Sequence, residues 1–329
     1  MYKVASAKDL GTIFQLRNVI NRKNIGKKPK KDVNAHEDFF QQVVESHVLA
    51  AAMEFFGMDN IEDDPNAEIF PPTLWMLEKE ERYAILLSVC GRIVDEFTDI
   101  RTFETSPDQG DKGKQDQILA YAKEVMSFGL LYTELVDAVR EGDGLRVLRW
   151  WRFMLLIFKA TSRKNYSIEA FIILAQYQYL LSPREKSQLL YSRFINTHGL
   201  PGRNISCDLY MEHLNRLLKD AIKALGANKT PKAIDRVSKC IAPLDELLER
   251  FDTIHNYSPQ SDCHKNPSAT KDITIMLEQL RKADVFHSTH GRKHHAFSNF
   301  SNNPVISLKQ KDVSEWMKSQ WTKLLAGLL

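Results

Sequence analysis

The chain has 329 residues, of which 43% are hydrophobic and 26% are charged, and its formal net charge is +3. This length and balance are typical of a globular protein with a sizeable core, built as one large domain or two smaller ones. The net charge is too small to indicate nucleic-acid binding by itself, so such a role has to rest on local clusters of basic residues.

Apolar residues recur at intervals of three and four along nearly the whole chain, which is the spacing of one face of an α-helix. The first such run follows a capping-box pattern of Asn34 and Glu37 and stops at Gly57. A later run begins with Ser182 and Pro183, a strong start signal. After the first run we expect helices at about 78–97, 115–141, 143–160, 167–181, 183–197, 207–225, 231–254, 271–285 and 311–326.

Polar, turn-rich segments separate these runs and indicate how the chain is divided. The segment "TSPDQGDKGKQD" is a candidate boundary between an N-terminal helical region, residues 1–105, and a main helical region, residues 115–329. A single continuous domain remains the alternative. Residues 287–310 have no strong period and are expected to form an extended arm. The sequence therefore predicts an all-α, multi-helix fold with irregular loops and a C-terminal arm.

One predicted helix, "CDLYMEHLNRLLK", carries Asp208, Glu212, Asn215 and Lys219 on a single face, because they are spaced i, i+4, i+7 and i+11. Two carboxylates one turn apart repel each other unless something compensates their charge. A hard cation such as Mg²⁺ or Mn²⁺ could do so, and so could Arg216 as an ion pair with Glu212. A solvated polar face has the same spacing. Metal binding by Asp208 and Glu212 therefore stands beside two plainer alternatives.

Basic residues gather in three places. The loop "NRKNIGKKPKK" has the charge density that suits a phosphate backbone and fits a short nuclear-import pattern. Arg163 and Lys164 precede a helix start expected at Ser167, where a phosphate can bind, although Glu169 is equally explained as an acid that stabilises the helix dipole. The arm at 287–295 is rich in histidine, but the spacing matches no four-ligand zinc pattern, so it suits nucleic-acid contact better.

These clusters, together with Arg203, define a set of expected nucleic-acid-binding residues. They are Arg22, Lys23, Lys27, Lys28, Lys30, Lys31, Arg163, Lys164, Arg203, Arg292 and Lys293.

The N-terminus, the apolar runs and the cysteines indicate which classes of protein the sequence fits. The N-terminus "MYKVASAKDL" lacks the apolar core of a signal peptide, and runs such as "FMLLIF" are far shorter than a membrane span. The four cysteines form no CxxC pair, which argues against a disulfide framework or a zinc ribbon. We expect a soluble, intracellular protein with no membrane partner. Common nucleophile, phosphate-loop and zinc-protease motifs do not occur in the chain.

Several stretches together resemble one family. They are "GTIFQLRNVINRKNI", "VNAHEDFFQQVVESHVLAAA", "EGDGLRVLRWWRFMLLIFKATSRKNYSIEAF" and "NTHGLPGRNISCDLYMEHLNRLLK". In this combination the chain resembles the eukaryotic family catalogued as domain of unknown function 6589, from about residue 9 to residue 300. The most specific parts are "KNYSIEA" and "GRNISCDLYMEHLNR".

The resemblance implies a link to transposons. Longer members resemble transposases with a ribonuclease-H-like core, in which acidic residues hold two metal ions. Glu212 or Glu169 would then be the late catalytic acid, with Asp208 and His213 as supporting candidates. This chain resembles only the helical C-terminal portion, because it shows no strand-rich region to carry the early aspartates. We therefore expect a transposon-derived, DNA-binding, nuclear protein without enzymatic activity as an isolated chain. A helical protein-interaction module without nucleic-acid function is the alternative.

Overall fold

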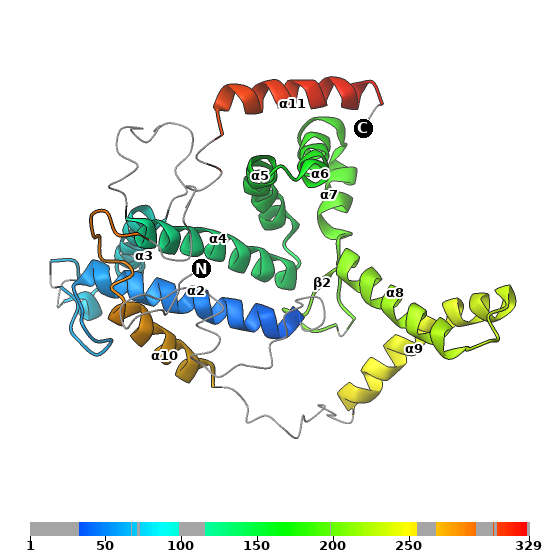
Figure 1. Ribbon diagram of the computed structural model, residues 1–329, viewed down its shortest axis with the longest axis horizontal. Coiled ribbons are helices and arrows are strands. Elements are labelled where there is room, and N and C mark those ends of the chain that lie inside the picture. Colours follow the sequence, from blue (N-terminus) through cyan, green and yellow to red (C-terminus); the bar gives the residue numbers. More distant parts are fainter. Residues whose placement is uncertain are drawn as a thin grey trace. The chain divides into compact units, whose positions relative to one another are not determined.

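The computed structural model describes residues 33–66, 68–70, 73–98, 116–197, 199–254, 268–293, 305 and 308–327. These residues confirm the expected all-α, multi-helix fold (Figure 1). The strands found in this part of the chain are β1 (Phe194–Ile195) and β2 (Ile205–Ser206), which pair antiparallel. Within the same residues, no helix combines the length and the apolarity that crossing a membrane requires.

The chain divides into two compact units, and each is discontinuous in sequence. Unit 1 comprises Met1–Tyr132 and Asn266–Glu315, and unit 2 comprises Thr133–Lys265 and Trp316–Leu329. The divisions fall inside α4 (Gln117–Glu141) and α11 (Gln310–Leu325). The boundary expected between residues 105 and 115 lies outside the described residues, so it stays a prediction.

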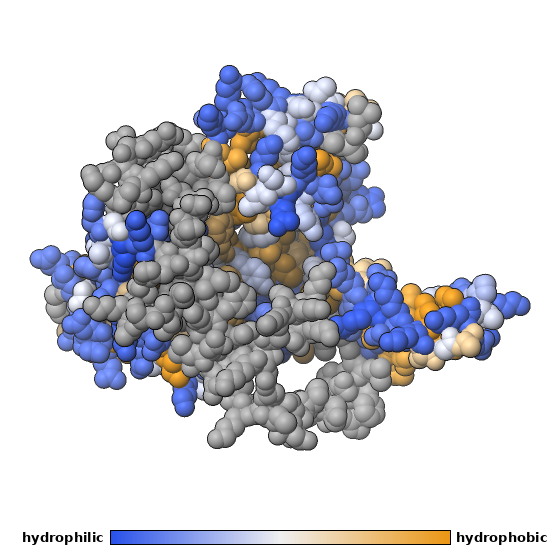
Figure 2. Space-filling model, viewed as in Figure 1, coloured by the Kyte–Doolittle hydropathy of each residue, from blue (hydrophilic) through white to orange (hydrophobic). Residues whose placement is uncertain are grey.

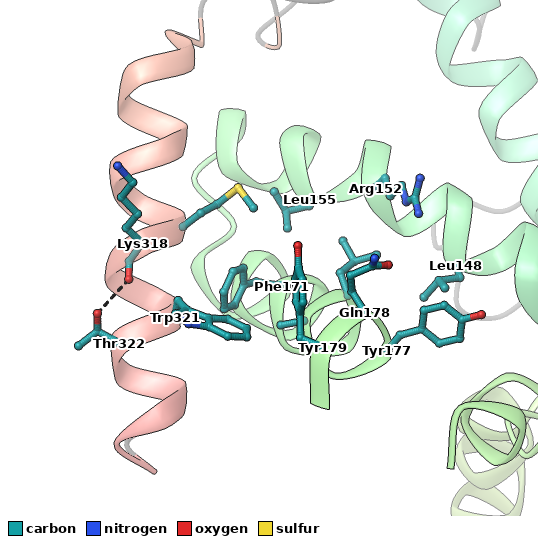
Figure 3. A pocket seen from close by; sticks show the side chains of 13 residues that line it. Leu148, Arg152, Leu155, Phe171, Tyr177, Gln178, Tyr179, Lys318, Trp321 and Thr322 are labelled. Atoms are coloured by element: carbon teal, nitrogen blue, oxygen red, sulfur yellow. Dashed lines mark hydrogen bonds between the residues drawn. The ribbon is translucent and has the colours of Figure 1, made fainter. Parts of the chain in front are cut away.

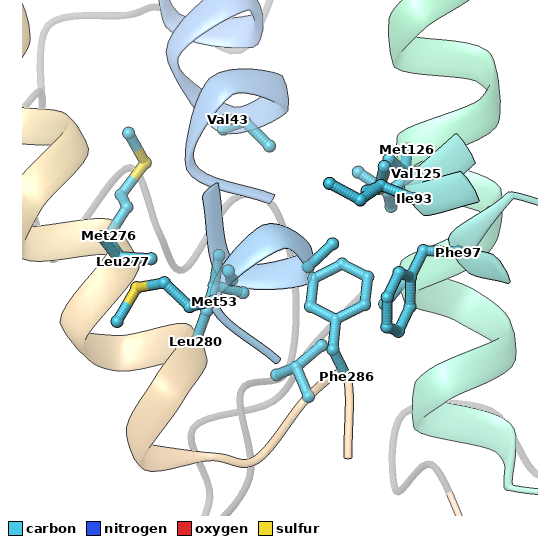
Figure 4. Packing of buried hydrophobic residues seen from close by; sticks show 14 of the residues in the cluster. Val43, Met53, Ile93, Phe97, Val125, Met126, Met276, Leu277, Leu280 and Phe286 are labelled. Atoms are coloured by element: carbon cyan, nitrogen blue, oxygen red, sulfur yellow. The ribbon is translucent and has the colours of Figure 1, made fainter. Parts of the chain in front are cut away.

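Unit 1 is built around α2 (Val33–Phe56), which carries apolar residues on most of its circumference, as expected of a helix covered on several sides. The other elements are η2 (Leu74–Met76), α3 (Lys79–Phe97), the first part of α4, and α10 (Ala269–Lys282). Although α2 and α10 lie far apart in sequence, they pack side by side (Figure 1). Figure 4 shows their contact, in which Met276, Leu277 and Leu280 of α10 face Met53 of α2.

A histidine lies inside this apolar core. His47 of α2 is fully buried, and its Nδ1 atom lies 2.7 Å from the carbonyl oxygen of Val43. Its ring also meets the edge of Phe286, with 6.1 Å between the ring centroids. Burial lowers the pKa of His47 to about 4, so the imidazole is neutral in the folded unit at physiological pH.

Of the extended arm expected at residues 287–310, residues 287–293, 305 and 308–310 are described; the first of these segments contains a bend at His287 and a turn at His290 and Gly291. Arg292 fixes this segment. Its Nη2 atom lies 2.8 Å from Oδ2 of Asp116, and its guanidinium also donates to the carbonyl oxygens of Asp284 and His287. The side chains of Asp116 and Arg292 are 7% and 16% exposed, so this ion pair is mostly buried. The charge pattern alone could not reveal the pair, because its two members are far apart in the sequence.

Unit 2 begins with the end of α4 and continues with α5 (Gly144–Ala160) and α6 (Lys164–Ala175), which pack tightly together. Asp143 starts α5 by accepting hydrogen bonds from the backbone N–H groups of Leu145 and Arg146. The remaining elements are the π-helix η4 (Gln176–Leu180), α7 (Pro183–Tyr191), α8 (Cys207–Ala224), α9 (Pro231–Ile254) and the last part of α11.

Two predicted helices of unit 2 differ from the structure. The helix expected at 167–181 starts earlier, at Lys164, and its last turn is a π-helix. The helix expected at 183–197 has the predicted capping box of Ser182 and Glu185 but stops at Tyr191. It stops because the next residues form β1, which pairs with β2 after a turn that contains two glycines with positive φ, Gly199 and Gly202.

Candidate functional site

Unit 2 contains a groove with a volume of about 630 Å³, within the usual range for ligand pockets. Its walls come from α5, α6, η4 and the second half of α11 (Figure 3). Leu148 and Leu155 line it from α5, and the buried Phe171 lines it from α6. Because α11 is far from the other three segments in sequence, only the folded chain creates this groove.

Aromatic rings form much of the lining. The ring of Trp321 meets Phe171 and Tyr179 edge to face, with centroid distances of 6.5 Å and 5.4 Å. Figure 3 shows Tyr179 standing between Trp321 and Gln178. Tyr179 is nevertheless 72% exposed. The groove therefore offers an aromatic ring that is held by a neighbour and yet open to a ligand.

The π-helix η4 places these side chains. In this segment the backbone N–H of Leu181 donates to the carbonyl oxygen of Gln176, five residues earlier, at 3.0 Å. Tyr177, Gln178 and Tyr179 all line the groove. Short π-helical turns occur frequently at functional sites. Sequence reasoning missed this site, although the run "QYQYLL" before the Ser182 cap was a visible signal.

The charged residues of the groove have one sign. Arg152 from α5 and Lys318 from α11 line it, and none of the described lining residues is acidic. Two further cations lie over aromatic rings of this part of unit 2. The ammonium group of Lys186 is 5.4 Å from the ring centroid of Tyr177, and that of Lys159 is 4.8 Å from the ring centroid of Trp316. The described lining of the groove is therefore mostly apolar and aromatic, and its charged residues are basic. Figure 3 shows the ammonium group of Lys318 directed away from Tyr179.

The helix α8 carries the predicted acidic stripe. Asp208 and Glu212 are both exposed, and so is Glu169 on α6. Among the described residues, no group of three or more histidine, cysteine or acidic side chains is arranged to hold a metal ion. Glu169 therefore does not join the two stripe carboxylates in such a group. Arg216 and Glu212 do not form the alternative ion pair, and the guanidinium of Arg216 donates to His213 instead.

His213 belongs to a polar cluster that joins α8 to α9. Its Nε2 atom lies 3.1 Å from Oδ1 of Asp245, and Nη2 of Arg216 lies 3.0 Å from its Nδ1 atom. Because a guanidinium can only donate, Nδ1 accepts and Nε2–H donates to the aspartate. Asp245 is 8% exposed, and its other oxygen, Oδ2, is buried without a hydrogen-bond partner among the described residues. The cluster couples the two helices of the hairpin, and sequence reasoning had not selected Asp245.

The expected nucleic-acid-binding residues fall into three groups. Arg163, Lys164, Arg203 and Lys293 are exposed. Arg292 is held by Asp116 and by backbone carbonyl groups, so its guanidinium is already satisfied within unit 1. The remaining basic residues lie outside the described residues: Arg22, Lys23, Lys27, Lys28, Lys30 and Lys31.

Comparison with known proteins places the chain in a family. A family model described as a family of unknown function, DUF6589, matches residues 2–264, which is most of the chain. No curated protein and no solved structure matches it. The chain belongs to the DUF6589 family.

Proposed function

We propose that this chain binds nucleic acid and does not cleave it on its own. The observation that carries the proposal is the groove of unit 2, in which Arg152 accompanies aromatic rings without any acidic side chain in the described lining. Proteins that bind nucleic acid without strong sequence preference usually combine positive charge with exposed aromatic faces. Arg163 and Lys164, exposed at the start of α6, add positive charge to the same unit.

The proposal includes a transposase-like origin. The sequence resembles transposon-associated proteins, and a helical region of such a protein would keep its nucleic-acid contacts. A nuclear location is part of the proposal and is supported by the short import-like basic run "KKPKK" at residues 27–31. These statements rest on the sequence resemblance together with the distribution of basic residues along the chain.

The lack of cleavage follows from the chemistry that cleavage needs. Two-metal phosphodiester chemistry requires ions about 3.5–4 Å apart, held by acids from separate elements. Asp208 and Glu212 lie on one exposed helix, and no third ligand is arranged with them among the described residues. Mg²⁺ or Mn²⁺ at these two carboxylates would keep most of its water ligands and would not organise a substrate.

A second candidate function is supported by the same groove. Leu148, Leu155, Leu174 and Phe171 give it a largely apolar lining, which suits the apolar face of a partner helix. The two candidates differ in their dependence on salt, because displacement of counterions from nucleic acid makes binding weaken steeply as salt rises. Docking of an apolar helix does not displace counterions from nucleic acid, so its affinity lacks this steep dependence on salt.

The proposed function is tested by measuring binding of the full chain to single-stranded and duplex DNA between 50 and 200 mM salt. We expect log Kd to rise with log salt, and Arg163→Gln together with Lys164→Gln to reduce the slope by about 1.5. Lys239→Gln is the matched control, because Lys239 already pairs with Asp235 on α9. Absence of binding at 50 mM salt, or a slope unchanged in the double variant, would contradict the proposed contacts.

A nuclease assay with Mg²⁺ or Mn²⁺ tests the proposal that the chain does not cleave nucleic acid on its own. We expect no cleavage of single-stranded or duplex DNA by the full chain. Glu212→Gln and Glu169→Gln serve as controls against a contaminating nuclease. Cleavage by the unaltered chain that both variants lose would overturn the proposal and make these two residues part of an active site.

A further inference from the structure

We infer that the groove of unit 2 binds the unpaired bases of single-stranded nucleic acid, with Tyr179 as the stacking ring and Arg152 as a phosphate contact. This inference rests on the proposed function and names its ligand class. The two residues come from different elements, η4 and α5, and both line the same groove (Figure 3).

Tyr179 has the surroundings that a stacking ring needs. Its edge-to-face contact with Trp321 restrains the ring, so little orientation is lost when a ligand binds. Tyr179 is 72% exposed, so its ring has apolar area that a ligand can cover. Stacking of a base on an exposed aromatic ring is tolerant of sequence, because every base has a π-face.

The chemistry of the groove favours a single strand over a duplex. In a duplex the base faces are stacked on one another, and a protein reaches only the phosphates and the base edges in the grooves. A single strand exposes base faces beside its phosphates. The groove provides both complements, because the rings of Tyr179 and Trp321 lie in the same lining as the guanidinium of Arg152.

The same features favour a nucleic acid over a plain apolar helix. A helix that docks through apolar anchors needs no cation, whereas Arg152 lines this groove and no acidic residue stands in its described lining. Gln178, beside Tyr179, also offers an amide that can hydrogen-bond to a base edge. An acidic amphipathic peptide is the protein partner that would compete with this assignment.

The test compares Tyr179→Ala with Tyr191→Ala in the full chain. Tyr191 is a matched control, because it is also an exposed tyrosine of unit 2 but does not line the groove. The probes are a 12-nucleotide oligo-dT, an abasic strand of the same length that keeps the phosphates, and a 12-base-pair duplex. We expect Tyr179→Ala to weaken binding of oligo-dT by about five- to a hundredfold. Binding of the abasic strand and the duplex should stay unchanged, and so should all binding by Tyr191→Ala.

Two further variants separate stacking from other effects. Tyr179→Trp keeps an aromatic face and should retain oligo-dT binding, while Arg152→Gln should weaken oligo-dT and the abasic strand alike. Circular dichroism spectra of all variants confirm that the fold is kept.

The outcomes distinguish this inference from the proposed function. If the chain binds neither DNA form, both fail. If DNA binds but Tyr179→Ala changes the abasic strand as much as oligo-dT, or changes neither, the inference alone fails. It also fails if an acidic amphipathic peptide binds with a dependence on Tyr179 while oligo-dT shows none.

Discussion

The helices of unit 1 and those of unit 2 bury their apolar side chains to different extents. In unit 1, α2, α3, α4 and α10 share one large cluster of buried residues, and an ion pair and a neutral histidine are enclosed with it. In unit 2 the main buried cluster comprises Leu155, Ala170, Phe171 and Ala175, with tryptophans packed against it.

Both units leave large apolar residues exposed, among them Trp75 and Met76 in unit 1. On the α8–α9 hairpin of unit 2 these are Leu209, Met211, Leu244 and Leu247, and Figure 2 shows hydrophobic surface on this hairpin. No residue of α8 is fully buried. Along η4, Tyr179 and Leu180 are exposed as well. Soluble proteins rarely leave grouped apolar side chains open without an interaction to make.

The difference assigns separate roles to the two units. The core of unit 1 encloses a large apolar cluster and the Asp116–Arg292 ion pair, so these side chains serve the stability of the unit. Unit 2 keeps an aromatic groove, a helical hairpin and several cations accessible, which are the features of a binding surface. Substitutions in unit 1 should therefore act on folding, and substitutions at the groove of unit 2 should act on binding.

The largest expected effect comes from breaking the ion pair of unit 1. Asp116→Ala would leave the guanidinium of Arg292 buried without its carboxylate partner, which costs about 3–5 kcal/mol of unfolding free energy. Urea unfolding measures this loss, and hydrogen exchange should show it in residues 116–126 and 269–292. Asp59→Ala is the control, because Asp59 is 96% exposed at its contact with Arg281 and should change stability by less than about 0.5 kcal/mol. An equally small effect of Asp116→Ala would show that unit 1 does not depend on enclosed charge.

A smaller effect is expected from acid through His47. Its folded pKa, about 4, lies below the ordinary value of 6.5, so the unfolded chain binds the proton more readily. Stability should therefore fall as the pH drops below about 6.5, by about 2 kcal/mol between pH 7.5 and pH 5. His47→Leu should remove this part of the pH dependence, which urea unfolding at both pH values would measure. If both proteins lose the same stability, the buried imidazole is not its source.

The third effect is about as large as that of His47 and sharpens the comparison from the side of unit 2. A Cβ atom at Gly144, the first residue of α5, would collide with the backbone carbonyl of Leu190 at the end of α7. We expect Gly144→Ala to lower the unfolding free energy by about 1–3 kcal/mol and to reduce hydrogen-exchange protection in α5 and α7. Gly91→Ala on α3, where a Cβ meets nothing, should leave stability equal or slightly higher. Loss of protection confined to unit 1 in Gly144→Ala would contradict the close approach of α5 and α7.

The order of the helices and most of their ends followed from the sequence. Ser182 and Glu185 form the predicted capping box, and the helix expected at 231–254 spans Pro231–Ile254. These features are local, because helix hydrogen bonds and caps join residues three or four apart. The exposed positions of Asp208 and Glu212 agree with the solvated face that spacing alone had left open.

The tertiary structure decided which side chains meet. The sequence predicted that Arg292 would be an accessible basic residue of an arm. In the structure it forms a mostly buried ion pair with Asp116, from a distant segment. His213 finds Asp245 on the next helix, and the groove joins Leu148 of α5 and Tyr179 of η4 to Trp321 of α11. Such contacts depend on how helices pack, and the local sequence of an apolar helix face does not specify which other helix it will contact. The sequence by itself therefore determined the helices, and the packing of distant segments determined the site.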